Sequence, residues 1–154
     1  MRIVVVEDDS HQAEFIADGL AEEFGCPIKV IPDELEFRRQ FAELENDPPS
    51  VLVIDVFLRW TSPRPGMALP PDDALRHEDA GFRCQQLLAG STATRDVPVI
   101  LYTVFHSSHH SAEIVELPRG VSYLVKDSEL TPLFQEIRRL IGAGPWSGGL
   151  DPAR

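Results

Sequence analysis

The sequence has only two cysteines, Cys26 and Cys84, and no long apolar run among its 154 residues. Two isolated cysteines do not make a disulfide framework, so we expect free thiols in a reducing compartment. No apolar stretch reaches the ~18 residues of a membrane-spanning helix, and the start of the chain lacks the apolar core of a signal peptide. We therefore expect a cytoplasmic protein with no membrane partner.

Basic residues are also scarce. Lys and Arg number 14 against 25 Asp and Glu, which gives a formal net charge of −11. Because nucleic-acid affinity comes largely from Lys and Arg contacts to phosphates, this balance argues against direct nucleic-acid binding and leaves protein partners open. The hydrophobic content of 43% is that of an ordinary globular domain, and the length is sufficient for one core.

Four short apolar runs each end in charged or hydroxyl side chains. They span residues 3–9, 51–55, 99–103 and 121–126, and they end in Glu7, Asp8, Asp55, Thr103 and Lys126. Such runs are typical of strands buried on both faces of a parallel sheet, where sites form at the carboxyl ends of the strands. Carboxylates that converge with a lysine there favour a divalent cation and a phosphoryl group over an apolar ligand.

Segments with helical periodicity alternate with these runs and with a short fifth strand near residues 28–31. We expect helices over about residues 11–24, 34–45, 82–88, 107–117 and 129–141. Ser10, Asp33 and Ser128 are predicted to cap the first, second and last helix, and Gly25 to end the first.

This order predicts an α/β fold of the flavodoxin-like type, in which a doubly wound five-stranded parallel sheet is built from five βα units. Right-handed crossovers place helices on both faces of such a sheet. The strand order 2-1-3-4-5 puts Glu7 and Asp8 beside Asp55. We expect one domain over residues 1–144, followed by a flexible Gly- and Pro-rich tail at 145–154.

Residues 59–80 interrupt the pattern after the third strand. Ordinary βα loops have about 2–6 residues, so this segment is predicted to be an insertion. We expect Met67 and Leu69, together with Trp60, to pin it to the body. Trp60 fits either such a packing anchor or a contact for a partner, and residues 72–79 are expected to form a solvated face. The insertion is predicted to shape access to the site or the choice of partner; the alternative is a solvated loop without a role.

With these residues placed, the chain resembles the CheY-like receiver domains of two-component response regulators. The resemblance runs from Arg2 to about Ile141, apart from residues 59–80. It implies that Asp55 is the phosphoacceptor, and that Mg²⁺ (or Mn²⁺) is held by Glu7, Asp8, Asp55 and the backbone carbonyl of Phe57.

The same resemblance assigns three further positions. It implies that Thr103 is the switch hydroxyl, Tyr123 the switch aromatic and Lys126 the lysine that pairs with the phosphoryl group. Two positions depart from the family pattern: Asp127 stands where many receivers have proline, and Val104 is larger than the residue usually found after the switch hydroxyl. A larger side chain at Val104 is expected to narrow access to the phosphoryl group.

The function implied is that of a stand-alone phosphoacceptor without an output domain, not of an enzyme beyond self-catalysed phosphotransfer and autodephosphorylation. Its expected partners are a sensor histidine kinase or phosphotransfer protein and a downstream protein target. The target, or a second copy in a homodimer, is expected on the face formed by residues 107–117, the strand at 121–125 and the last helix.

Three other functions share part of this residue pattern. A phosphorylation-independent interaction scaffold is the main alternative, and the presence of Asp55, Thr103 and Lys126 argues against it. A flavin-binding protein is disfavoured because Glu7 and Asp8 would repel the flavin phosphate. An aspartyl phosphohydrolase is disfavoured because no second acid stands two residues after Asp55.

His106, His109 and His110 share one face of the helix expected there. Their spacing fits a transition-metal site or, more simply, the solvated start of a helix.

Overall fold

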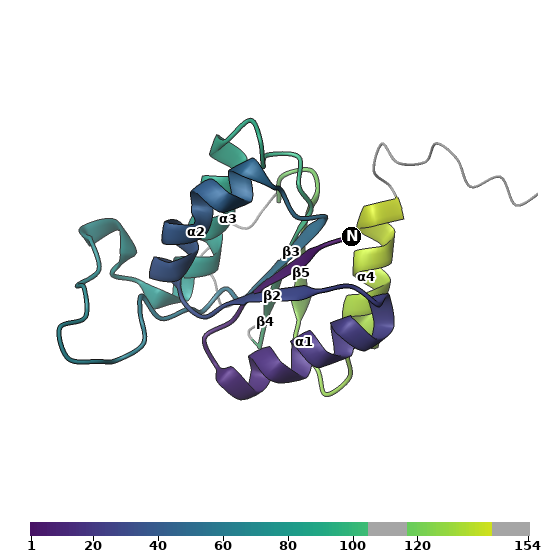
Figure 1. Ribbon diagram of the computed structural model, residues 1–154, viewed down its shortest axis with the longest axis horizontal. Coiled ribbons are helices and arrows are strands. Elements are labelled where there is room, and N and C mark those ends of the chain that lie inside the picture. The colour runs from purple at the N-terminus through teal and green to yellow at the C-terminus, as the bar shows by residue number, and fades with distance from the viewer. Residues whose placement is uncertain (105–116, 143–154) are drawn as a thin grey trace, which may run out of the picture.

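The computed structural model describes residues 1–104 and 117–142 (Figure 1). Its sheet has five parallel strands in the order β2-β1-β3-β4-β5, which confirms the predicted fold class and strand order. The strands are β1 (Ile3–Val6), β2 (Ile28–Ile31), β3 (Val51–Ile54), β4 (Val99–Thr103) and β5 (Val121–Val125). Every residue of the three inner strands is buried, as continuous apolar runs predict.

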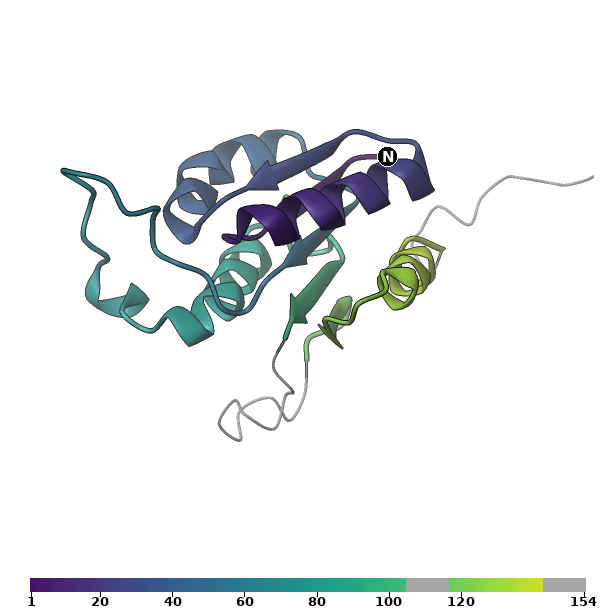
Figure 2. The same ribbon diagram turned by 90° about the horizontal axis from the view of Figure 1, so that it is seen from below.

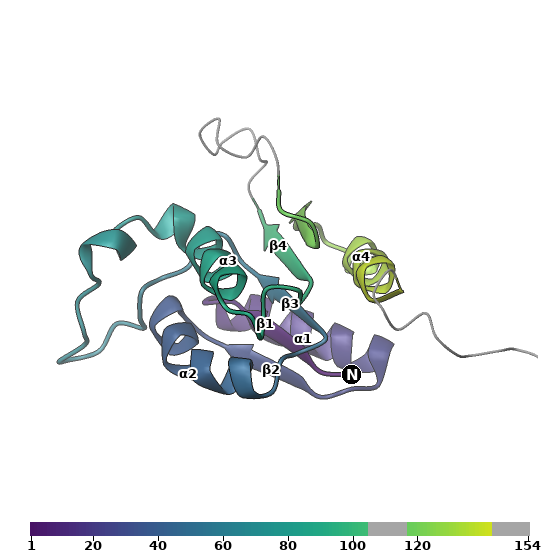
Figure 3. The same cartoon turned by 90° about the horizontal axis from the view of Figure 1, so that it is seen from above.

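Helices cover both faces of this sheet. They are α1 (Ser10–Phe24), α2 (Glu34–Asn46), α3 (Ala80–Gly90) and α4 (Thr131–Gly142). Figures 1 and 3 show α2 and α3 on one face and α1 and α4 on the other. Most of the predicted helix at 107–117, the tail at 145–154 and the three histidines at 106, 109 and 110 lie outside the described residues.

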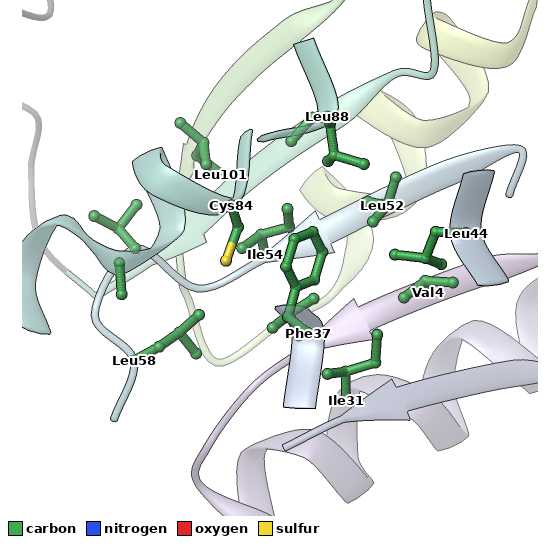
Figure 4. Close-up of a cluster of buried hydrophobic side chains, with 14 residues drawn as sticks. Val4, Ile31, Phe37, Leu44, Leu52, Ile54, Leu58, Cys84, Leu88 and Leu101 are labelled. Atoms are coloured by element: carbon green, nitrogen blue, oxygen red, sulfur yellow. The ribbon is translucent and has the colours of Figure 1, made fainter. Parts of the chain in front are cut away.

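The core has two halves, one on each face of the sheet. In the half under α2 and α3, the side chains of Phe37 and Cys84 pack with Ile54 of β3 (Figure 4). Burial raises the pKa of the Cys84 thiol, which therefore stays protonated. Both cysteines are free, as expected. The other half joins α1 and α4 through residues such as Ile16 and Ile137.

The helix caps agree with the sequence only in part. Asp33 caps α2 by accepting a hydrogen bond from the Glu36 backbone N–H, and Gly25 ends α1 with a left-handed φ of 58°. Ser10 does not cap α1. Asp9 does, because α1 begins at Ser10 and the Asp9 carboxylate directly before it accepts from the backbone N–H groups of His11 and Gln12.

The last helix begins later than predicted. The hydroxyl and backbone N–H of Ser128 bond to Asp127, so Ser128 caps nothing, and α4 begins at Thr131. Pro132 then falls in the first turn, where the missing N–H of proline has no helical partner to lose.

The insertion after β3 contains two short 3-10 turns, η1 (Asp72–Ala74) and η2 (His77–Asp79). The charged residues at 72–79 are largely exposed, as predicted for a solvated face, and Ala74 is the one residue of these turns that is buried. Trp60 is 8% exposed and therefore acts as a packing anchor. The predicted contacts of Met67 and Leu69 are wrong, since these side chains are 44% and 80% exposed. Figures 1 and 2 show the reason: the middle of the insertion projects away from the sheet.

A buried ion cluster holds the two ends of the insertion to α2. Glu34, only 1% exposed, accepts two hydrogen bonds from Arg83, at 2.9 and 2.7 Å, and one of 2.9 Å from Arg38. The guanidinium of Arg38 also lies 5.3 Å from the ring centre of Trp60. The third guanidinium nitrogen of Arg83, Nη1, donates to the backbone carbonyl of Arg76, so the cluster reaches both ends of the segment.

Gly81 lets α3 approach the backbone of Asp55. Its N–H donates to the Val56 carbonyl at 2.9 Å, and a Cβ at Gly81 would lie 2.4 Å from the Asp55 carbonyl oxygen. We expect Gly81→Ala to lower the free energy of unfolding by about 1–3 kcal/mol, because backbone atoms must move to admit the methyl group.

Gly90→Ala is the matched control at the other end of α3. No atom lies within 4 Å of a Cβ there, so we expect a neutral or slightly stabilising effect, up to about 1 kcal/mol. Urea unfolding of the two variants measures both values. Equal stability of the two variants would contradict the close approach at Gly81.

Candidate functional site

The register of the sheet brings the predicted site residues together. Val6 of β1 pairs with Ile54 of β3, so the residues that follow, Glu7 and Asp55, end at the same level of the sheet. On the other side of β3, the backbone N–H of Lys126 donates to the carbonyl of Thr103 at 2.7 Å. The carboxyl ends of β1, β3, β4 and β5 thus form one edge, as the strand order predicts.

Lys126 joins two of the carboxylates. Its Nζ lies 2.5 Å from Glu7 Oε2 and 2.7 Å from Asp55 Oδ2. All three side chains are at least nine-tenths buried. Charge-assisted hydrogen bonds of this kind are strong and short, and here they fix the ammonium directly beside the predicted phosphoacceptor.

Three carboxylates of the edge could share a cation. Glu7, Asp8 and Asp55 each offer an oxygen, and these oxygens lie within 4.8 Å of one another. An all-oxygen, carboxylate-rich set of this size suits Mg²⁺, which prefers oxygen ligands and keeps several waters. The Phe57 backbone N–H donates to Asp55 Oδ1 at 3.1 Å; the role of the Phe57 carbonyl stays a prediction.

Burial and mutual repulsion change the protonation of this group. Burial and the neighbouring charge of Asp55 raise the pKa of Glu7 to about 7, although Lys126 acts in the opposite direction. Burial alone would lower the pKa of Lys126, but the carboxylates of Asp55 and Glu7 raise it overall, so the ammonium stays charged.

The predicted switch residues lie at the same edge. Thr103 is fully buried, and its Oγ1 has no hydrogen-bond partner within the described part of the chain. A buried hydroxyl without a partner is uncommon and costly, so Thr103 is suited to donate to an incoming ligand. Tyr123 is half-buried on β5, and burial together with the charge of Asp55 raises its pKa to about 12. Val104 is 60% exposed, and its predicted effect on access to the phosphoryl group stays a prediction.

Comparisons with known proteins support this reading of the fold. No family model matches the sequence, and no curated protein matches it. Among solved structures, the signal receiver domain of a histidine kinase from Syntrophus aciditrophicus is similar over 99% of this chain and 98% of its own, with 22% identity and a TM-score of 0.66.

The chain has the fold of a receiver domain.

Two other solved structures share this receiver fold. The response regulator TrrA from Thermotoga maritima, in complex with Mg²⁺-BeF, is 20% identical, with a TM-score of 0.63 over 90% of this chain and 97% of its own. The receiver domain of a sensor histidine kinase from Pseudomonas aeruginosa has a magnesium ion coordinated in its active-site cleft. It is 17% identical, with a TM-score of 0.62 over 92% of this chain and 98% of its own.

Within residues 1–104 and 117–142 of this receiver fold, no helix combines the length and apolar character needed to cross a bilayer.

Two residues at the edge were not predicted from the sequence. Arg59 donates to Asp8 from its backbone N–H, at 3.1 Å, and from its side-chain Nε, at 2.8 Å. Tyr102 lies under Lys126, whose Nζ is 5.9 Å from the ring centre. Neither belongs to a sequence motif, because both contacts join segments far apart in the chain. The one available signal for Arg59 was its place at the start of the insertion, four residues after the predicted phosphoacceptor Asp55.

The raised pKa of Glu7 predicts a pH-dependent stability. The folded state holds the Glu7 proton more tightly than the unfolded state, whose pKa is near 4.5, so this contribution is fully present below pH 4.5 and is lost as the pH rises through about 7. Relative to a Glu7→Gln variant, the wild type should therefore lose up to about 3 kcal/mol of unfolding free energy over this window.

Urea unfolding at a series of pH values in the presence of a chelator measures this difference. Glu14→Gln, which removes a carboxylate from the exposed face of α1, is the control for charge alone. A wild type and a Glu7→Gln variant whose stabilities run parallel from pH 4.5 to pH 8 would contradict the raised pKa.

Proposed function

We propose that this protein is a phosphoacceptor receiver. It takes a phosphoryl group onto Asp55, with Mg²⁺, from a histidine kinase or phosphotransfer protein, and phosphorylation then changes its binding to a downstream protein. The observation that carries the proposal is the set of contacts around Asp55. Its Oδ2 lies 2.7 Å from Lys126 Nζ, and oxygens of Glu7 and Asp8 lie close enough to bind one metal ion together with Asp55. The receiver fold, shared with response regulators and histidine kinase receivers, supports it.

The proposed reaction moves the phosphoryl group from a phosphohistidine nitrogen to a carboxylate oxygen of Asp55. The Asp55 O–P bond forms as the P–N bond breaks, and the electron pair of that bond stays on the imidazole, which takes up a proton. Such transfers depend mostly on positioning and charge neutralisation. Lys126 supplies one fixed positive charge, and the hydroxyl of Thr103 supplies a hydrogen bond to a phosphoryl oxygen.

The residues present fit a magnesium ion. Glu7, Asp8 and Asp55 would hold it, with the carbonyl of Phe57 as a further ligand, and the bound ion would keep Asp55 ionised and offset the charge of the phosphoryl oxygens. The occurrence of Mg²⁺ in the Pseudomonas receiver and of Mg²⁺-BeF in TrrA supports this choice of metal. Mn²⁺ has similar ligand preferences and is an alternative.

The proposed response to phosphorylation starts at Thr103. When its buried hydroxyl bonds to the phosphoryl group, the end of β4 is drawn toward Asp55, and Tyr123 repacks on β5. This is a shift between two packings, driven by contacts that exist only in the phosphorylated form. The change would reach the surface of β5 and α4, which we propose as the site for a downstream protein or a second copy; residues 107–116 of the expected face lie outside the described residues.

On this proposal, the protein is a signalling phosphoprotein that works in the cytoplasm, with hydrolysis of the aspartyl phosphate as its only further reaction. Water attacks the phosphorus, the O–P bond to Asp55 breaks, and inorganic phosphate leaves. The insertion at residues 59–80 adjoins the metal ligands through Arg59, so we propose that it influences access or partner choice.

Asp55→Asn should abolish labelling by a small phosphodonor, because the amide cannot act as the carboxylate nucleophile. Intact-mass measurement after incubation with acetyl phosphate and Mg²⁺ detects the adduct. Asp9→Asn, which alters the cap of α1 and leaves the three proposed metal ligands in place, is the control and should still be labelled. Labelling of Asp55→Asn, or equal labelling of the wild type in excess chelator, would rule out this assignment and favour a phosphorylation-independent scaffold.

Thr103→Ala should separate labelling from switching. The variant keeps Asp55 and Lys126, so it should still be phosphorylated, but the chemical-shift changes that phosphorylation causes on β5 should shrink. Lys126→Ala should impair both labelling and switching, because a buried cation is lost beside two carboxylates. Phosphodonor labelling and ¹⁵N spectra of both variants test this. Wild-type labelling together with wild-type shift changes in both variants would show that the switch is wrong.

A further inference from the structure

Arg59 occupies the part of the site where the metal would bind. Its backbone N–H and Nε both donate to Asp8 Oδ2, at 3.1 and 2.8 Å, and its Nη2 donates to the Asp8 backbone carbonyl at 2.6 Å. Asp8 is one of the three carboxylates whose oxygens lie within 4.8 Å of one another. The insertion therefore places a cation of its own on a proposed metal ligand.

The other two carboxylates are neutralised from the opposite side. Lys126 bonds to Glu7 and Asp55. Among the described residues it forms no hydrogen bond or ion pair with Asp8. The two protein cations thus divide the site, with the buried Lys126 on one part and the half-exposed Arg59 on the other. Of the two, Arg59 leaves its partner more easily, because an exposed ion pair is weaker than a buried one.

Arg59 also fixes the start of the insertion to α2. Its carbonyl accepts from the Glu34 backbone N–H at 3.1 Å, and the carbonyl of Trp60 accepts from Leu35 at 2.8 Å. Asp33, the cap of α2, accepts from the backbone N–H of Ser62 at 3.2 Å. Arg59 therefore contacts both Asp8 and the start of α2, and Trp60 and Ser62 bond to the same end of this helix.

We propose that Arg59 is a built-in competitor for the metal, so that Mg²⁺ and the Arg59 guanidinium bind Asp8 alternately and metal binding loosens the start of the insertion. A guanidinium and a divalent cation on one carboxylate repel each other, and the two N–H groups of Arg59 already take up both lone pairs of Asp8 Oδ2. This inference rests on the proposed magnesium site and adds a residue that sets its affinity and links it to the insertion.

The first test is the affinity for Mg²⁺, measured by isothermal titration calorimetry at constant ionic strength. Arg59→Ala and Arg59→Gln should bind Mg²⁺ about three- to tenfold more tightly than the wild type, as expected for loss of a competing surface ion pair. Arg76→Ala is the matched control, because Arg76 lies in the same insertion but pairs with Glu78 and Asp79, and it should leave the affinity unchanged.

The outcomes separate the two levels of the proposal. If Mg²⁺ binds and Asp8→Asn weakens it, but Arg59→Ala and Arg59→Gln match the wild type, competition by Arg59 is overturned and the metal site stands. If no variant binds Mg²⁺, the proposed metal site itself fails. If Arg76→Ala tightens binding as much as Arg59→Ala, the effect is one of overall charge and the specific competition is overturned.

The second test is hydrogen exchange at the Glu34 and Leu35 amides, which donate to the start of the insertion. In the wild type, saturation with Mg²⁺ should speed their exchange about two- to fivefold, because local opening becomes easier once Arg59 leaves Asp8. In Arg59→Ala their exchange should be fast already and insensitive to Mg²⁺. Unchanged exchange in the Mg²⁺-saturated wild type would overturn the link between the metal and the insertion.

Discussion

Three carboxylates crowd one edge of the sheet, and the arrangement around them depends on the cations that offset their repulsion. Lys126 is buried with Glu7 and Asp55 and bonds to both. A buried lysine with two carboxylate partners stays charged, and each carboxylate is held in place by the same ammonium. The phosphoacceptor chemistry proposed for Asp55 needs this fixed charge, since little else in a phosphoryl transfer is left for the protein to supply.

Cation and carboxylates can meet because of the parallel sheet. β1 and β3 are neighbours although they are not consecutive in the chain, so Glu7 lies beside Asp55. Lys126 directly follows β5, which lies on the opposite side of β3 from β1, with β4 between β3 and β5. The continuous apolar runs set the register by burying every inner position, and Gly81 allows α3 to pack on the backbone that carries Asp55. The site is thus positioned by the packing beneath it, while the hydroxyl of Thr103 has no hydrogen-bond partner among the residues that the structure describes.

The segment at residues 59–80, predicted to be an insertion, is held to the rest of the domain at both ends. Glu34 and its two arginines hold both ends of the segment against α2, and Trp60 adds apolar area at the base. Between these anchored ends the chain projects outward, where Leu69 is exposed. The structure therefore combines a fixed base beside the proposed metal ligands with an outer part that is free for contacts of its own.

The sheet, its strand order and the positions of Glu7, Asp55 and Lys126 could be predicted from the sequence, because they follow from short-range patterns of apolar runs and from the topology that such patterns allow. So could the cap at Asp33 and the end of α1 at Gly25, where one residue decides a local geometry. The first and last caps were assigned wrongly because neighbouring polar residues compete for the same backbone groups: Asp9 takes the place of Ser10, and Ser128 bonds to Asp127.

Contacts between side chains that are far apart in the chain could not be predicted and are seen only in the folded structure. The contact between Arg59 and Asp8, 51 residues apart, and the burial of Glu34 with Arg83, 49 residues apart, leave no periodic mark in the sequence. Met67 was predicted to pack and is exposed, because apolar character alone does not show whether a loop returns to the core. Periodicity reports the face that an element buries against its own sheet, whereas ion pairs between loops depend on the path of the chain in space, which is set only when the whole domain folds.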